Sequence, residues 1–161
     1  MLRSFSMALF CLIGVSAQPA GAQDSPNTVM ITAKVGQKSY ESAGQGSCRH
    51  TPTAAIYGVP AALWMVGFTG SDDAAVKSMN LTLWKPKNGG SQQFSLSLST
   101  GSSSHRIDVG GRGEQIGSGK ASVVAAGAGG RIEVSGKDDS GKTIEVVIQC
   151  PAFAGVEAEG G

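Results

Sequence analysis

The stretch Phe94-Ser95-Leu96-Ser97-Leu98-Ser99 places a large apolar residue at every second position, with a serine after each one. Successive side chains of a β-strand point to opposite faces, so this alternation predicts a half-buried antiparallel strand. The same period of two appears at 28–35 and at 76–84. No segment shows sustained helical periodicity, and the 24 glycines of the chain disfavour long helices. The sequence therefore predicts an all-β protein.

Turn signals divide the chain into about eight or nine short strands, at the spacing of an all-β domain. A strand is expected at 62–68, after the interruption at Pro60, and a polar loop is expected at 49–53. We expect the strands to form an antiparallel two-sheet β-sandwich with one disulfide, rather than a closed barrel.

Residues 1–22 have the three parts of a secretory signal peptide. Arg3 supplies the positive charge, 7–15 is an apolar run, and Ala20-Gly21-Ala22 is the expected cleavage site. Neither this run nor any later segment reaches the about 20 apolar residues that a membrane-spanning helix needs. We therefore predict a periplasmic or secreted protein that does not span the membrane. Its single domain is expected at 23–153, followed by a flexible acidic and glycine-containing tail at 154–161.

Two cysteines, Cys48 and Cys150, remain once Cys11 is removed with the predicted leader. An even number of cysteines in an exported chain favours a structural disulfide. The sequence has no CxxC pair, which is the spacing that would indicate a metal or redox site. Cys150 shares the phase of Ile144 and Ile148, so we expect its side chain to face the core.

The charged residues nearly balance, with 13 Lys and Arg against 12 Asp and Glu, which makes nucleic acid a poor candidate partner. Residues 136–143 match the phosphate-binding pattern G-x-x-x-x-G-K-[ST]. That motif requires a helix to begin at Lys142-Thr143, whereas the residues that follow are β-branched and typical of a strand. We therefore predict a hairpin turn at 138–141, no nucleotide binding and no cofactor.

Two histidines, His50 and His105, are the weak candidates for a metal site, since no metal-ligand spacing supports them. His105 shares the inward phase of Ile107, so we expect it at a sheet end with a backbone partner. The carboxylate pairs at 72–73 and 138–139 lie in predicted turns, where Asp is common for backbone reasons. No catalytic residue is assigned, although carboxylates distant in sequence can still pair in space.

Trp84 follows Asn80 and Thr82 in the polar phase of its strand, opposite an apolar row formed by Met79, Leu81 and Leu83. An outward tryptophan near a strand end is a stacking platform for a sugar, a peptide or a lipid. The alternative is that a neighbouring loop covers it. Trp84, Asn80 and Thr82 are the predicted ligand-binding residues.

Three short motifs stand near the two ends of the chain: Gly36-x-x-x-Tyr40, Gly46-Ser47-Cys48 and 144–151, which reads IEVVIQCP. With these motifs the two ends resemble the mycobacterial 19-kDa lipoprotein antigen family, and the chain is also similar to small exported bacterial β-rich proteins. The resemblance implies a small exported β-rich protein with an early and a terminal cysteine and no enzymatic activity. The chain departs from that family because it lacks the lipidated cysteine.

These patterns favour an exported, non-enzymatic binding or structural module of the cell envelope or secretome, with an unknown envelope or extracellular ligand. One alternative is a hydrolase that acts on an envelope polymer through spatially paired carboxylates. A second is a periplasmic metal-handling protein that uses His50 and His105. Fold class alone does not distinguish the three.

Overall fold

The computed structural model describes residues 27–111 and 113–156, so the predicted leader, Cys11 and residues 157–161 of the predicted tail lie outside the described part. Every regular element in that part is a β-strand. None of its segments is a helix with the length and apolarity needed to cross a membrane. The strands are β1 (Asn27–Val35), β2 (Lys38–Ile56), β3 (Val59–Thr69), β4 (Val76–Pro86), β5 (Gln93–Thr100), β6 (Ser103–Val109), β7 (Ser118–Ala126), β8 (Gly129–Lys137), β9 (Thr143–Cys150) and β10 (Ala154–Gly155).

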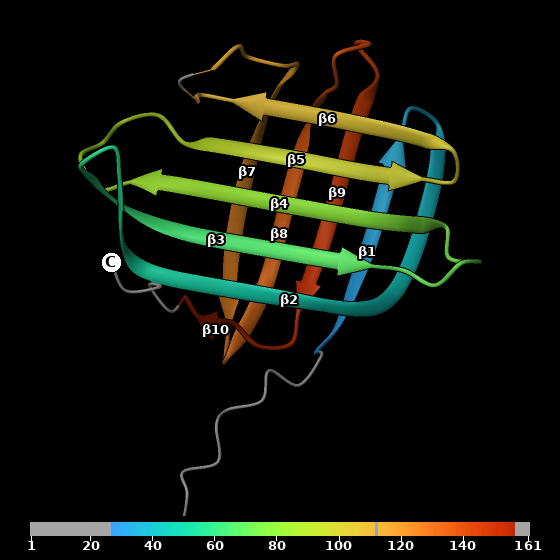
Figure 1. Ribbon diagram of the computed structural model, residues 1–161, viewed down its shortest axis with the longest axis horizontal. Coiled ribbons are helices and arrows are strands. Elements are labelled where there is room, and N and C mark those ends of the chain that lie inside the picture. The colour runs from blue at the N-terminus through green and yellow to red at the C-terminus, as the bar shows by residue number, and fades with distance from the viewer. Residues whose placement is uncertain (1–26, 112, 157–161) are drawn as a thin grey trace, which may run out of the picture.

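The strands form one continuous sheet in the order β6-β5-β4-β3-β2-β1-β9-β8-β7, and β10 pairs with β2 in parallel. This sheet folds over on itself into two layers whose strands cross steeply in Figure 1. Strands β2 to β6 run across the front of the view, and β1, β9, β8 and β7 run behind them. All the pairs between neighbours in this order are antiparallel.

The expected two-sheet sandwich is therefore wrong in its topology, because β2 belongs to both layers. Its first half pairs with β1 and its second half with β3. The chain bends between these halves around Gly46, where a Cβ atom would come within 2.6 Å of the Val29 side chain and 2.7 Å of the Gly67 carbonyl. Only glycine fits such a close approach of two strands. The result is a nearly closed, barrel-like sheet.

The polar segment expected as a loop at 49–53 is also part of β2. A register shift between Thr51 and Ala54 takes up Pro52, whose missing N–H removes it from the ladder. The bulge thus allows the strand to continue through a proline.

The two free edges of the sheet are β6 and β7, and the segment just before β7 pairs with β6 at one point. Asp108 and Ile116 exchange backbone hydrogen bonds of 2.8 and 3.0 Å in an isolated bridge. The side-chain oxygen of Gln92 accepts a further bond of 3.4 Å from the Ala121 N–H. These contacts bring the edges together without a continuous ladder.

One apolar core of buried side chains lies between the layers in the described residues. Phe94, Leu96 and Leu98 of β5 are at most 2% exposed, which confirms the alternation read from the sequence. The back layer contributes Ile132 and Ile148, among others. The predicted disulfide is confirmed: Cys48 and Cys150 are bonded across a Cα–Cα distance of 6.0 Å, and both side chains are buried. It ties β2 to β9, the two strands that flank β1 in the sheet.

Candidate functional site

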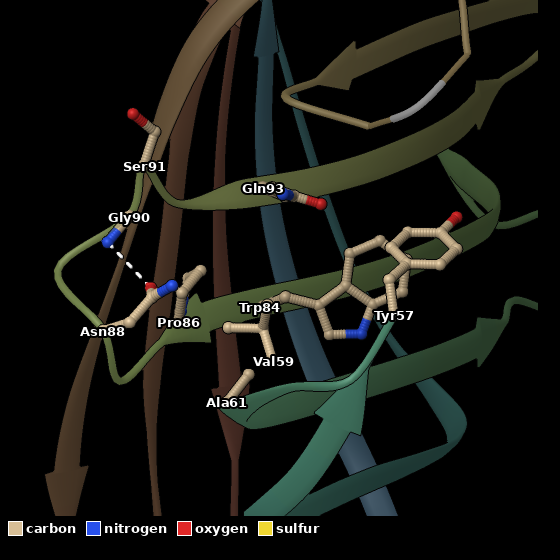
Figure 2. Close-up of a pocket in the computed structure, with 9 residues that line it drawn as sticks. All are labelled: Tyr57, Val59, Ala61, Trp84, Pro86, Asn88, Gly90, Ser91 and Gln93. Carbon is tan, nitrogen blue, oxygen red and sulfur yellow. Dashed lines mark hydrogen bonds between the residues drawn. The ribbon is translucent and has the colours of Figure 1, made fainter.

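A groove of about 290 Å³ opens at the end of β4 (Figure 2). Its walls come from the β2–β3 turn, the start of β3, the end of β4 and the loop that leads to β5. The lining residues are Tyr57, Val59, Ala61, Trp84, Pro86, Asn88, Gly90, Ser91 and Gln93. Apolar and aromatic side chains form most of the wall, and the polar ones come mainly from the loop.

Trp84 reaches this groove because of the alternation along β4. Leu81 and Leu83 point into the core and are at most 1% exposed, whereas Trp84 lies on the opposite face and is half-buried. Leu63 and Gln93 are its cross-strand partners on β3 and β5. The facing predicted for Trp84 from the sequence is confirmed, while its role in binding remains a prediction.

Tyr57 was not singled out by the sequence, yet it forms a wall of the groove. It occupies the two-residue turn between β2 and β3 with a φ of 51°, and Gly58 follows with a φ of 79°. Positive φ at both positions is typical of the tight turn that matches the twist of a hairpin, but it is unfavourable for a bulky residue. The Tyr57 side chain is 60% exposed. Backbone strain retained at an exposed aromatic residue is characteristic of functional sites.

The other two predicted ligand residues, Asn80 and Thr82, lie on the same outer face of β4 as Trp84 but outside the groove. Across the strand, Asn80 pairs with Ser97 and Thr82 with Ser95. Asn80 and Ser97 are exposed, and the other two are half-buried. These four residues form a polar row, which leads along the sheet toward the groove.

His105 faces the interior as predicted, but its partner is not a backbone group. Its Nδ1 lies 2.8 Å from Oδ2 of Asp138, and the two side chains are 6% and 1% exposed. This contact joins β6 to the turn between β8 and β9. A carboxylate oxygen accepts, so Nδ1 donates the hydrogen bond.

The second oxygen of Asp138 is also fully used. Oδ1 accepts bonds from the Ser140 N–H at 3.0 Å, the Ser140 hydroxyl at 2.7 Å and the Lys142 N–H at 2.8 Å. Burial acts to raise the pKa of Asp138, but the bonds from Ser140, His105 and Lys142 outweigh it and lower the pKa below its ordinary value. Asp138 is therefore a structural anion, and its oxygens are already occupied by protein donors.

The hydrogen bonds of Asp138 also shape residues 136–143, the segment that matches the phosphate-binding pattern. Residues between β8 and β9 form a tight turn in which the Gly141 N–H bonds to the Asp138 carbonyl at 3.0 Å. A strand, not a helix, begins at Thr143. The predicted hairpin turn is confirmed, and the helix N-terminus that would face a phosphate is not formed there.

His50 lies far from His105 along the sheet. It is on β2, whereas His105 is on β6, four strand spacings away, which is on the order of 19 Å along the sheet. The Nδ1 of His50 lies 2.9 Å from the Leu63 carbonyl, and its ring stacks on Trp64 at 4.5 Å. The structure thus does not bring the two histidines together. Within residues 27–111 and 113–156, no three His, Cys, Asp or Glu side chains form a cluster fit to hold a metal ion.

Two carboxylates, Glu133 and Glu145, line one hollow on the outer face of the back layer. Glu133 is paired with Arg131 at 2.7 Å, and both side chains are about half exposed, at 48% and 52%. Glu133 and Glu145 bear on the hydrolase hypothesis, which needs two carboxylates in one hollow. Glu133 lacks the apolar enclosure that keeps a catalytic acid protonated.

Comparisons with protein-family models, with curated proteins and with solved structures found no match for this chain. The resemblance of its two ends to the mycobacterial 19-kDa lipoprotein antigen family stays a prediction.

Proposed function

We propose that this protein is an exported, non-catalytic binding module that holds a glycan through the groove at Trp84 and the polar row beside it. The observation that carries the proposal is the placement of two aromatic walls, Trp84 and Tyr57, at the end of a row of exposed and half-buried hydroxyl and amide groups. A sugar ring has an apolar C–H face and hydroxyl groups around its rim. It needs both kinds of contact.

The size of the groove supports a single ring as the occupant. A volume of about 290 Å³ is near the lower end of the range for small-molecule sites, which begins at roughly 300 Å³. The Trp84 and Pro86 side chains offer flat apolar surface, and Asn88 and Ser91 offer polar atoms at the rim. A longer chain would continue over Thr82 and Ser95 of the polar row.

Export is the second part of the proposal. The Cys48–Cys150 disulfide supports it, because such bonds persist in oxidising compartments. The predicted leader at 1–22 supports it independently. In that location, glycans of the envelope or the surroundings are the abundant ligands with this chemistry.

The test is affinity gel electrophoresis of the mature protein in gels that contain soluble neutral or acidic polysaccharides. We expect at least one polysaccharide to retard the wild type, and both Trp84→Ala and Tyr57→Asn to remove most of that retardation. Asn suits the left-handed turn position, so Tyr57→Asn removes the ring and keeps the turn. The matched control is Val124→Ser, which removes an apolar side chain that is 60% exposed on the back layer. Retardation equal in all four proteins, or none in any gel, would refute the glycan proposal.

A further inference from the structure

A second cavity lies on the other face of β4, between the two layers of the sheet. Its volume is about 440 Å³, within the range of small-molecule sites. Trp84 and Lys85 are consecutive and point to opposite faces, so Trp84 lines the groove and Lys85 lines this cavity. The remaining lining residues are His50, Trp64, Gln92, Ala121, Ser122, Val123, Ala125 and Phe153.

One side of this interlayer cavity is a rigid aromatic wall. His50 and Trp64 stack with an interplanar angle of 10°, and Phe153 meets the His50 ring edge-on at 6.1 Å. The Leu63 carbonyl only accepts, so His50 Nδ1 donates to it, which fixes the orientation of the ring. The stacked rings are thus held in place before any ligand enters.

Two polar side chains of the cavity, Lys85 and Gln92, offer donors to a ligand. Lys85 has no carboxylate partner among the described residues, and no Asp or Glu lines the cavity. Gln92 uses its carbonyl oxygen to accept from the Ala121 N–H, which leaves its NH₂ group as a donor. A cation and an amide donor beside an apolar wall suit an anion and disfavour a cation.

We propose that the interlayer cavity is a second ligand site, for a small organic carboxylate with an aromatic or alkyl body. The carboxylate binds Lys85 and the Gln92 amide, and the apolar body lies against Trp64, Val123 and Phe153. The site is independent of the groove and of the glycan proposed for it. Its ligand differs in charge and in the face of the sheet that it contacts.

The probe is 4-phenylbutyrate, compared with the uncharged 4-phenyl-1-butanol. The sequence has two tryptophans, so Trp84→Phe leaves Trp64 as the only indole reporter. In that background we expect saturable quenching or a shift of Trp64 fluorescence with the carboxylate, and at least tenfold weaker binding of the alcohol. Isothermal titration calorimetry of the wild type should likewise show tighter binding of 4-phenylbutyrate than of 4-phenyl-1-butanol.

Lys85→Met should weaken 4-phenylbutyrate binding by about tenfold or more, because a charge-assisted hydrogen bond is lost. Lys85→Glu should abolish it. The matched control is Lys87→Met, which removes a nearby exposed lysine that does not line the cavity. Near-ultraviolet circular dichroism of each variant checks that the fold is intact. Equal affinity for the alcohol, equal affinity in Lys85→Met, or no saturable signal up to 10 mM carboxylate would overturn the proposal.

Discussion

Replacing Asp138 tests how much one buried anion contributes to closing this sheet. Its side chain is 1% exposed and accepts bonds from His105, Ser140 and Lys142. Asp138→Ala leaves all these donors without an acceptor, and each hydrogen bond lost to a charged group costs roughly 1.5–3 kcal/mol. Asp138→Asn keeps an oxygen of the same size and loses the charge, so we expect a smaller loss of about 1–2 kcal/mol.

Urea unfolding followed by circular dichroism measures these losses as shifts of the midpoint at unchanged slope. The control is Asp139→Ala, since Asp139 is the exposed neighbour in the same turn. We expect it to change the free energy of unfolding by less than about 0.5 kcal/mol. A loss below about 1 kcal/mol in Asp138→Ala would refute the role given to this buried carboxylate.

The pH dependence of the same experiment has a definite sign. The pKa of Asp138 is lowered in the folded protein from an ordinary value of 3.8. Its charged form therefore stabilises the fold fully above 3.8, and this contribution is lost as the pH falls further. The difference in stability between the wild type and Asp138→Asn should narrow in that acidic range. A difference that widens there would contradict the assignment.

Three further predictions concern the disulfide, Trp84 and the turn within 136–143. Cys48→Ala with Cys150→Ala opens a link between residues 102 apart and should cost up to ~4.7 kcal/mol by loop entropy. Calorimetry should then show a clear fall in melting temperature, and an unchanged value would refute the stabilising role of the disulfide. Trp84→Ala should cost less than about 1.5 kcal/mol, because the side chain is half-buried, and a larger loss in urea would assign Trp84 to the core. The mature protein should show no saturable ATP or GTP binding by calorimetry. Binding that disappears in Lys142→Ala would contradict the turn interpretation of 136–143.

The faces of the strands were predictable from the sequence, but their neighbours were not. Alternation at 94–99 indicates which side chains are buried and contains no information about which strand lies beside them. The expected sandwich failed at β2, where a bend at Gly46 and a bulge at Pro52 let one strand serve both layers. Pro52 lies in the segment that the sequence predicts to be a polar loop, at 49–53.

The candidate site, like the fold, was predictable only in part from the sequence. The face of the sheet on which Trp84 lies could be predicted from the period of two in its own strand alone. The place of Tyr57 in the groove was not predictable in this way, because its φ of 51° is set by the hairpin turn and not by its own preference. The pairing of His105 with Asp138 joins residues 33 apart in sequence, a contact that exists only after the layers fold together.

The most direct test of the glycan proposal is a heteronuclear NMR titration that follows the two indole N–H signals of the protein, assigned with Trp84→Phe. The titrant is an oligosaccharide from whichever polysaccharide retards the wild type most. We expect the Trp84 signal to shift with saturation, while the Trp64 signal, from the other face of the sheet, stays in place. A titration that leaves the Trp84 signal unmoved, or moves only that of Trp64, would contradict the central claim.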